Sequence, residues 1–94
     1  MRLVVWSEGA RSDYLGIIAF IAETNPVGAG RVGERIVKTA EDLGELATGH
    51  AGRVAGTHES VVVDLPYIVA YAIDCRPEGT ERIVILRVIH TSRH

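Results

Sequence analysis

The chain changes its hydrophobic period near its midpoint, and this change restricts the folds that it can adopt. Before residue 49, apolar residues recur at three- and four-residue spacings, which is typical of helices. After residue 52, Val, Ile and Tyr form short runs separated by turn-forming residues, which is typical of strands. Strands that follow a block of helices indicate an α+β fold, in which an antiparallel sheet carries helices on one face. At 94 residues, we expect one domain, 1–94, with one modest core.

A short strand and a first helix are predicted at the N-terminal end. Residues 2 to 6, "RLVVW", are rich in strand-forming residues. Ser7 is the expected N-cap of a helix over residues 8–23. One face of this helix is apolar and is formed by Ala10, Tyr14, Ile17, Ile18 and Ile21.

A second helix follows almost immediately. In "TNP", Asn25 is the expected cap and Pro26 takes the first helical position, where its missing N–H costs nothing. We expect this helix over residues 26–48, with Gly49 as its C-terminal stop. Its apolar stripe is Ala29, Val32, Ile36, Ala40, Leu43 and Ala47. Because the connection is so short, the two helices should form an antiparallel hairpin.

The second half predicts four strands. Their expected ranges are 53–56, 58–65, 67–73 and 82–90, with a turn over 76–81 that contains Pro77 and Gly79. The predicted order is therefore β-α-α-β-β-β-β, a short strand and a helical hairpin followed by a twisted antiparallel sheet. Tyr67 and Tyr71 should share one face of their strand with Val69 and Ile73.

The last predicted strand, "RIVILRVIH", contains an arginine where a buried residue is expected. Strict alternation places Arg87 in one row with Ile83, Ile85 and Ile89. A buried arginine without a partner is too costly to expect. Either the strand has an open face at this point, or Arg87 pairs with a carboxylate, for which the candidates are Asp64, Asp74 and Glu59.

Charge argues against a surface built to coat nucleic acid. The formal net charge is −2, and Lys38 is the only lysine. Residues 50–94 contain five arginines and five carboxylates. Proteins that grip a phosphate backbone usually carry a basic surface, so a main role in nucleic-acid binding is disfavoured.

Cysteine and hydropathy indicate a reduced, cytoplasmic protein without a membrane span. Cys75 is the single cysteine, so it has no partner for an internal disulfide, and we expect it to be incidental. No zinc-ligand spacing of Cys and His is present, and we expect no metal and no cofactor. Nothing resembles a signal peptide, and no apolar run approaches the roughly 20 residues that a membrane helix needs.

Five segments taken together resemble the RelE/ParE family of toxins from type II toxin–antitoxin pairs. They are "VVWSEGA" (4–10), "ETNPVGA" (23–29), "GRVAGTHESVV" (52–62), "PYIVAYAI" (66–73) and "ILRVIHTSRH" (85–94). The resemblance covers nearly the whole chain. It implies a helical hairpin packed on a twisted antiparallel sheet, the same topology that the hydrophobic periods predict.

The resemblance implies two alternative activities. RelE-like members cut messenger RNA on the ribosome, and ParE-like members inhibit DNA gyrase by binding. In the ribonuclease alternative the catalytic residues would be Arg53, Glu59, Arg87 and His90. This sequence departs from the ribonuclease pattern, because His58 replaces the usual arginine, the sheet half has no lysine, and no C-terminal aromatic follows. These departures favour binding over catalysis.

We therefore expect a ParE-like toxin that blocks replication through gyrase. The resemblance implies a cognate antitoxin and a higher-order complex with it; the ribosome and mRNA replace gyrase in the alternative. A third interpretation is a toxin-fold protein that acts only as a binding module. The predicted target-binding residues are Arg87, His90 and Arg93. The predicted antitoxin-binding residues are Tyr14, Ile18, Ile21, Val32 and Ile36.

Overall fold

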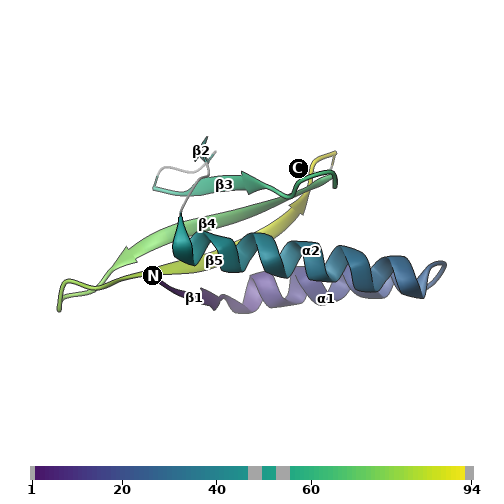
Figure 1. Cartoon of the computed structure of the whole chain (residues 1–94), viewed down its shortest axis with the longest axis horizontal. Helices are drawn as coiled ribbons and strands as arrows, with labels where there is room; N and C mark the ends of the chain where they lie inside the picture. Colours follow the sequence, from purple (N-terminus) through teal and green to yellow (C-terminus); the bar gives the residue numbers. More distant parts are fainter. Residues whose placement is uncertain (1, 47–49, 53–55, 93–94) are drawn as a thin grey trace.

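The protein is a helical hairpin packed against one face of a twisted sheet (Figure 1). The computed structural model describes residues 2–46, 50–52 and 56–92. The elements are β1 (Leu3–Trp6), α1 (Glu8–Ala22), α2 (Pro26–Glu45), β2 (His50–Ala51), β3 (His58–Val61), β4 (Tyr67–Cys75) and β5 (Glu81–His90). This order confirms the predicted α+β class and the β-α-α-β-β-β-β sequence of elements.

The strands lie in the order β1-β5-β4-β3-β2, so β5 lies inside the sheet, between β1 and β4, although it is the last strand along the chain. The pairs from β2 to β5 are antiparallel, as predicted. β1 instead runs parallel to β5, with Leu3 opposite Arg82 and Trp6 opposite Ile85. The described sheet is therefore mixed, and the parallel pair places the first strand beside the last one.

Both helix starts have the predicted caps. Ser7 Oγ accepts a hydrogen bond from the backbone N–H of Ala10 at 3.0 Å, and Asn25 Oδ1 accepts one from Gly28 at 2.9 Å. These side chains satisfy N–H groups that the first helical turn leaves without a partner. The helix ends come slightly earlier than expected, at Ala22 and Glu45, and residues 47–49 lie outside the described residues.

The core lies between α2 and the helix-facing side of the central strands. The fully buried large side chains come from both layers, and they are Tyr71, Ile36, Leu43, Ile83, Ile85, Val62 and Val69. Tyr67 is also buried, so Tyr67, Val69 and Tyr71 share the inner face of β4 as predicted. Burial of each such side chain stabilises the fold by about 1.5–3 kcal/mol relative to exposure.

A β-bulge in β5 corrects the predicted alternation. Tyr71 lies opposite Ile85, but Ala70 lies opposite Arg87, so Leu86 is an extra residue without a partner on β4. Inserting one residue reverses which face the following side chains occupy. Val88 is consequently buried at 4% exposure, while Ile89 and Arg87 leave the inner row. The prediction that Arg87 belongs to the isoleucine row was wrong for this reason.

The boundaries of the other strands also differ from the predictions. β3 ends at Val61 rather than at residue 65, because the chain turns through Asp64, whose φ is +65°. β2, over His50–Ala51, was not predicted. The strand predicted over 53–56 falls largely outside the described residues, and Gly56 lies in a turn.

Gly44 supports a prediction about the contact between α2 and β1. A Cβ at Gly44 would lie 2.6 Å from the backbone oxygen of Arg2, so Gly44→Ala should lower the free energy of unfolding by about 1–3 kcal/mol. Gly30→Ala, in the same helix with no atom within 4 Å of the new Cβ, should instead raise it by about 0.5–1 kcal/mol. Urea unfolding of both variants measures the difference. Equal stabilities would contradict the close packing.

Candidate functional site

A cleft of about 560 Å³ separates α1 from the end of β5. The two elements are in contact at the start of α1 and diverge toward its end (Figure 1). The lining combines an ion pair, three rings and an aliphatic side chain, supplied by Asp13, Arg87, Phe20, Tyr67, His90 and Ile17. Phe20 is 64% exposed, so the cleft offers a large apolar contact next to charged groups.

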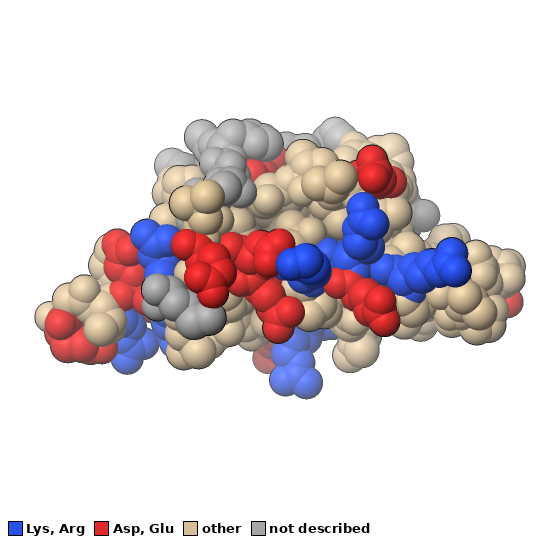
Figure 2. Space-filling model, viewed as in Figure 1, with Lys and Arg blue, Asp and Glu red and all other residues tan. Residues whose placement is uncertain are grey.

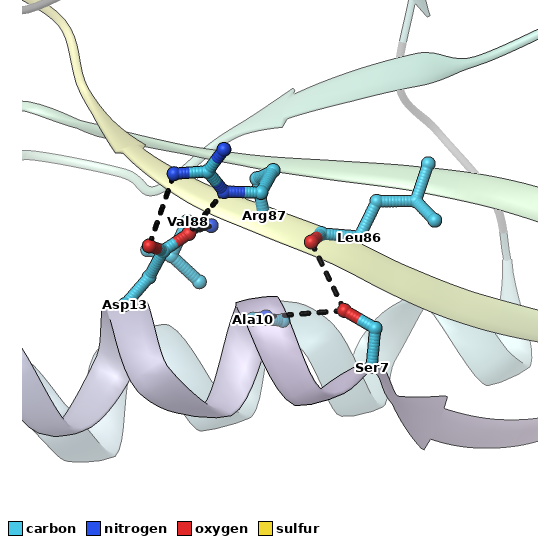
Figure 3. A network of polar contacts seen from close by, with 6 residues as sticks. All are labelled: Ser7, Ala10, Asp13, Leu86, Arg87 and Val88. Carbon is cyan, nitrogen blue, oxygen red and sulfur yellow. Dashed lines mark hydrogen bonds and ion pairs between the residues drawn. The ribbon is translucent and has the colours of Figure 1, made fainter.

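Arg87 pairs with Asp13 on α1, which is not one of the predicted carboxylates. Its Nε donates to Asp13 Oδ2 at 2.7 Å, and its Nη2 donates to Asp13 Oδ1 at 3.2 Å (Figure 3). The predicted partners Asp64 and Asp74 are paired with other arginines. The hydrogen bonds and the charge of Asp13 raise the pKa of Arg87, so the guanidinium is held in its charged form.

Side chains of α1 satisfy the backbone of the bulge. Ser7 Oγ donates to the carbonyl oxygen of Leu86 at 3.0 Å, and Asp13 Oδ2 accepts the N–H of Val88 at 3.0 Å (Figure 3). β1 pairs with β5 only as far as Ile85, so the rest of β5 would otherwise be an open edge on this side. Ser7 thus caps α1 and binds β5 at once.

His90 has a defined hydrogen-bond partner at the mouth of the cleft. Its Nδ1 accepts from the backbone N–H of Ser92 at 3.2 Å, and Ser92 Oγ lies 2.7 Å from the same nitrogen. A backbone N–H can only donate, so Nδ1 is an acceptor and the proton of the neutral ring sits on Nε2. The ring also packs against Tyr67, with centroids 5.2 Å apart and an interplanar angle of 88°.

The residues predicted for ribonuclease activity do not share one face of the sheet. Glu59 lies opposite Ala70, and Ala70 lies opposite Arg87, so these side chains leave the same face. His90 lies opposite Tyr67. Tyr67 is three residues before Ala70 on β4, so the side chains of Tyr67 and His90 leave the other face. Arg87 and His90 nevertheless both line the cleft between α1 and β5. Glu59 is buried at 8% exposure, and Arg53 and Arg93 lie outside the described residues.

His58 and Cys75 both contact a neighbouring side chain. His58 stacks on Tyr71, with ring centroids 5.3 Å apart, so it is part of the packing rather than a free surface residue. The exposed Cys75 thiol donates to Glu81, and this hydrogen bond raises the pKa of Cys75. A raised pKa keeps the thiol protonated and makes it a weak nucleophile.

The outer face of the helical hairpin has its own cleft, of about 370 Å³. Tyr14 and Ile18 line it from α1, and Gly33 lies beneath them on α2. Of the residues predicted to bind an antitoxin, Ile21 and Val32 are half-buried, whereas Ile36 is fully buried in the core. Ile36 therefore offers no surface to a partner in this structure.

The visible surface carries mixed charges. Figure 2 shows Lys and Arg interspersed with Asp and Glu along the helices, without a continuous basic patch on this face. α2 takes part in two ion pairs, Lys38 with Asp42 on the same helix and Arg35 with Asp64 in the turn after β3. Among the described residues, no group of three His, Cys, Asp or Glu is arranged to hold a metal ion. No described helix has the length and apolar character of a membrane span.

Relatives with similar sequences are toxins by name. A protein of Sinorhizobium fredii named "Putative toxin Y4kP" is 37% identical over 81 residues, which are 85% of this chain and 76% of that protein. Toxin RelE2 of Caulobacter vibrioides is 32% identical over 94 residues, covering 99% of each chain.

Two solved structures have the same fold. The toxin–antitoxin complex RelBE2 of Mycobacterium tuberculosis contains a chain that matches with a TM-score of 0.63 and 29% identity, over 95% of this chain and 96% of that one. A chain of the chromosomal ParDE system of P. aeruginosa matches with a TM-score of 0.83, over 96% of each chain. At 21% identity this second likeness shows the fold alone.

A family model assigns the chain more directly. The model described as "ParE toxin of type II toxin-antitoxin system, parDE" matches residues 4–94, which include both helices and every described strand except the first residue of β1. The sequence relatives, the fold and this match agree with the resemblance carried by the five segments. The chain is a member of the ParE toxin family of type II toxin–antitoxin systems.

Proposed function

We propose that this chain inhibits DNA gyrase by binding to it in the cytoplasm, and that the cleft between α1 and β5 supplies the contact. The observation that carries the proposal is the Arg87–Asp13 pair beside exposed Phe20. Interface anchors are typically aromatic residues and arginines set at the centre of a contact. The cleft provides both types on rigid elements, as a binding poison requires.

The positions of the titratable groups support binding rather than cleavage. Cleavage through a 2′-hydroxyl needs a base, an acid and cations close to one phosphate. Glu59 and His90 leave opposite faces of the sheet, so they do not flank one site. Asp13 already accepts three hydrogen bonds from Arg87 and Val88, so its oxygens are engaged in holding β5.

The charge of the cleft supports a protein partner. Asp13 balances Arg87, so the pair contributes no net positive charge to attract a phosphate backbone. A protein surface can instead supply apolar side chains for Phe20 and Ile17, together with a hydrogen-bond acceptor for the guanidinium.

We further propose that a cognate antitoxin covers the outer face of the hairpin. Two of the solved relatives come from toxin–antitoxin systems. Here Tyr14 and Ile18 line an open cleft, and Leu15 beside them is 61% exposed. Apolar surface at such a helical groove is typical of a site for an amphipathic segment. Ile21 and Val32 extend this surface in the proposal.

The second candidate function is ribosome-dependent cleavage of mRNA. The 32% identity to a relative named RelE2 favours it, since that relative matches the chain over its full length. In this alternative Arg87 and His90 would act on the RNA with Arg53 and Glu59. The two functions make different predictions for purified components.

The deciding experiment is a supercoiling assay with purified gyrase, beside primer extension on messages from induced cells. We expect the chain to inhibit supercoiling, to cause filamentation and a DNA-damage response, and to leave messages uncut. Relaxation of DNA by topoisomerase I, which should be unaffected, is the control for non-specific inhibition. Codon-phased cuts together with unimpaired gyrase would reject the proposal and favour the ribonuclease.

A further inference from the structure

We propose that Asp13 is the positioning residue for Arg87, so that helix α1 decides where the arginine of β5 points. This inference rests on the proposed binding function and names a residue that the function requires indirectly. The bulge at Leu86 releases Arg87 from the inner row of β5. A released arginine side chain has many rotamers, and something must select one of them.

Asp13 selects it through three hydrogen bonds from two parts of β5. Its carboxylate accepts from Arg87 Nε at 2.7 Å, from Arg87 Nη2 at 3.2 Å and from the backbone N–H of Val88 at 3.0 Å. One side chain thus fixes both the guanidinium and the strand that carries it (Figure 3). A bidentate contact fixes the plane of a guanidinium as well as its position.

The exposed fractions of the two side chains agree with a supporting role for Asp13 and a contact role for Arg87. The Asp13 side chain is 19% exposed, whereas that of Arg87 is 61% exposed. The third guanidinium nitrogen points away from Asp13 in Figure 3. This nitrogen is therefore available to the proposed target protein. The recognised group is therefore a carbonyl or carboxylate oxygen on the target protein, placed next to an apolar side chain that contacts Phe20.

Holding Arg87 in advance should strengthen binding to the target. A long side chain that is free before binding loses its rotamer freedom at the interface, which weakens affinity by up to roughly ten-fold. Asp13 imposes that order during folding instead. Asp13→Asn keeps the size of the side chain, but it replaces one accepting oxygen by an NH2 group, which would face the N–H donors of Arg87 or Val88. We therefore expect it to release Arg87.

The test compares Asp13→Asn with Ser7→Ala in the gyrase assay. Asp13→Asn should weaken inhibition about ten-fold, and it should cause no further loss when Arg87 is already alanine. Ser7→Ala removes the neighbouring cap of α1 and the bond to Leu86, but no contact to Arg87. It should be destabilised to a similar degree and inhibit like the wild type.

NMR can test whether Asp13 holds Arg87 without the use of gyrase. The Nε–H signal of Arg87 should be single and slow to exchange in the wild type and in Ser7→Ala, and fast to exchange in Asp13→Asn. Equal protection in all three proteins would overturn the inference. So would full inhibition by Asp13→Asn when Arg87→Ala is inactive, and the proposed function would then stand. If the wild type leaves gyrase unimpaired, the function fails, and the exchange rates alone decide the role of Asp13.

Discussion

Replacing Ile85 by alanine is expected to remove a large part of the free energy of unfolding, about 2–5 kcal/mol. Ile85 is fully buried, and it lies between Trp6 of β1 and Tyr71 of β4. Its side chain therefore fills the core where three strands meet, and its carbonyl oxygen accepts the N–H of Ser7 at 2.9 Å. Because small proteins are stable by only about 5–15 kcal/mol, the loss should be visible in any unfolding experiment.

Two milder substitutions show whether the loss comes from the packing of Ile85 or from any substitution in the sheet. Ile85→Val should cost only about 0.5–1.5 kcal/mol. Val61→Ala, at a position that is 52% exposed on β3, should stay within about 0.5 kcal/mol of the wild type. Urea unfolding followed by circular dichroism gives all three values. A loss for Ile85→Ala no larger than that for Val61→Ala would contradict the placement of the core.

Arg87→Ala should abolish most of the inhibition of gyrase, by at least about 30-fold, if Arg87 is an interface anchor. The structure offers a matched control on the same strand. Arg82 donates to Asp74 at 2.7 Å, the same distance as that between Arg87 and Asp13, but it lies at the opposite end of β5 from the cleft. Arg82→Ala should therefore inhibit like the wild type, and both variants should lose only about 0–1 kcal/mol of stability.

His90→Ala distinguishes the two candidate functions within the same assays. On the binding proposal it removes one ring at the mouth of the cleft, so inhibition should fall only partly. On the ribonuclease alternative it should abolish cleavage as completely as Arg87→Ala does. Equal inhibition of gyrase by Arg87→Ala and Arg82→Ala would show that the cleft is not the contact.

The local features of the fold could be predicted because each is encoded in a few adjacent residues. Ser7 and Asn25 were identified as caps from their positions before helical stripes, and both make the expected bonds. The inner face of β4 followed from simple alternation. The early end of α2 at Glu45 was missed, because a helix end depends on how the chain leaves toward the sheet.

The bulge and the partner of Arg87 could not be predicted in the same way. An extra residue in a strand leaves the apolar run "IVILRVI" unchanged in composition, so alternation alone places Arg87 in the wrong row. Asp13 lies 74 positions from Arg87 along the chain, and no local pattern relates the two. An Asp on the polar side of a helical stripe is normally solvated, and nothing in the sequence distinguishes Asp13 from such a residue.

The position of β5 has a consequence for how the protein is made. β5 is the last strand along these residues, yet it lies between β1 and β4. During synthesis β1 has no neighbouring strand until β5 emerges, and Ser7 must wait for a partner 79 positions later. Contacts between residues so far apart in the sequence form slowly, because the chain loses conformational entropy before the contacts stabilise it. A nascent chain therefore carries its helical hairpin before its α1–β5 cleft exists, and a partner that recognises the hairpin can bind before the toxin is complete.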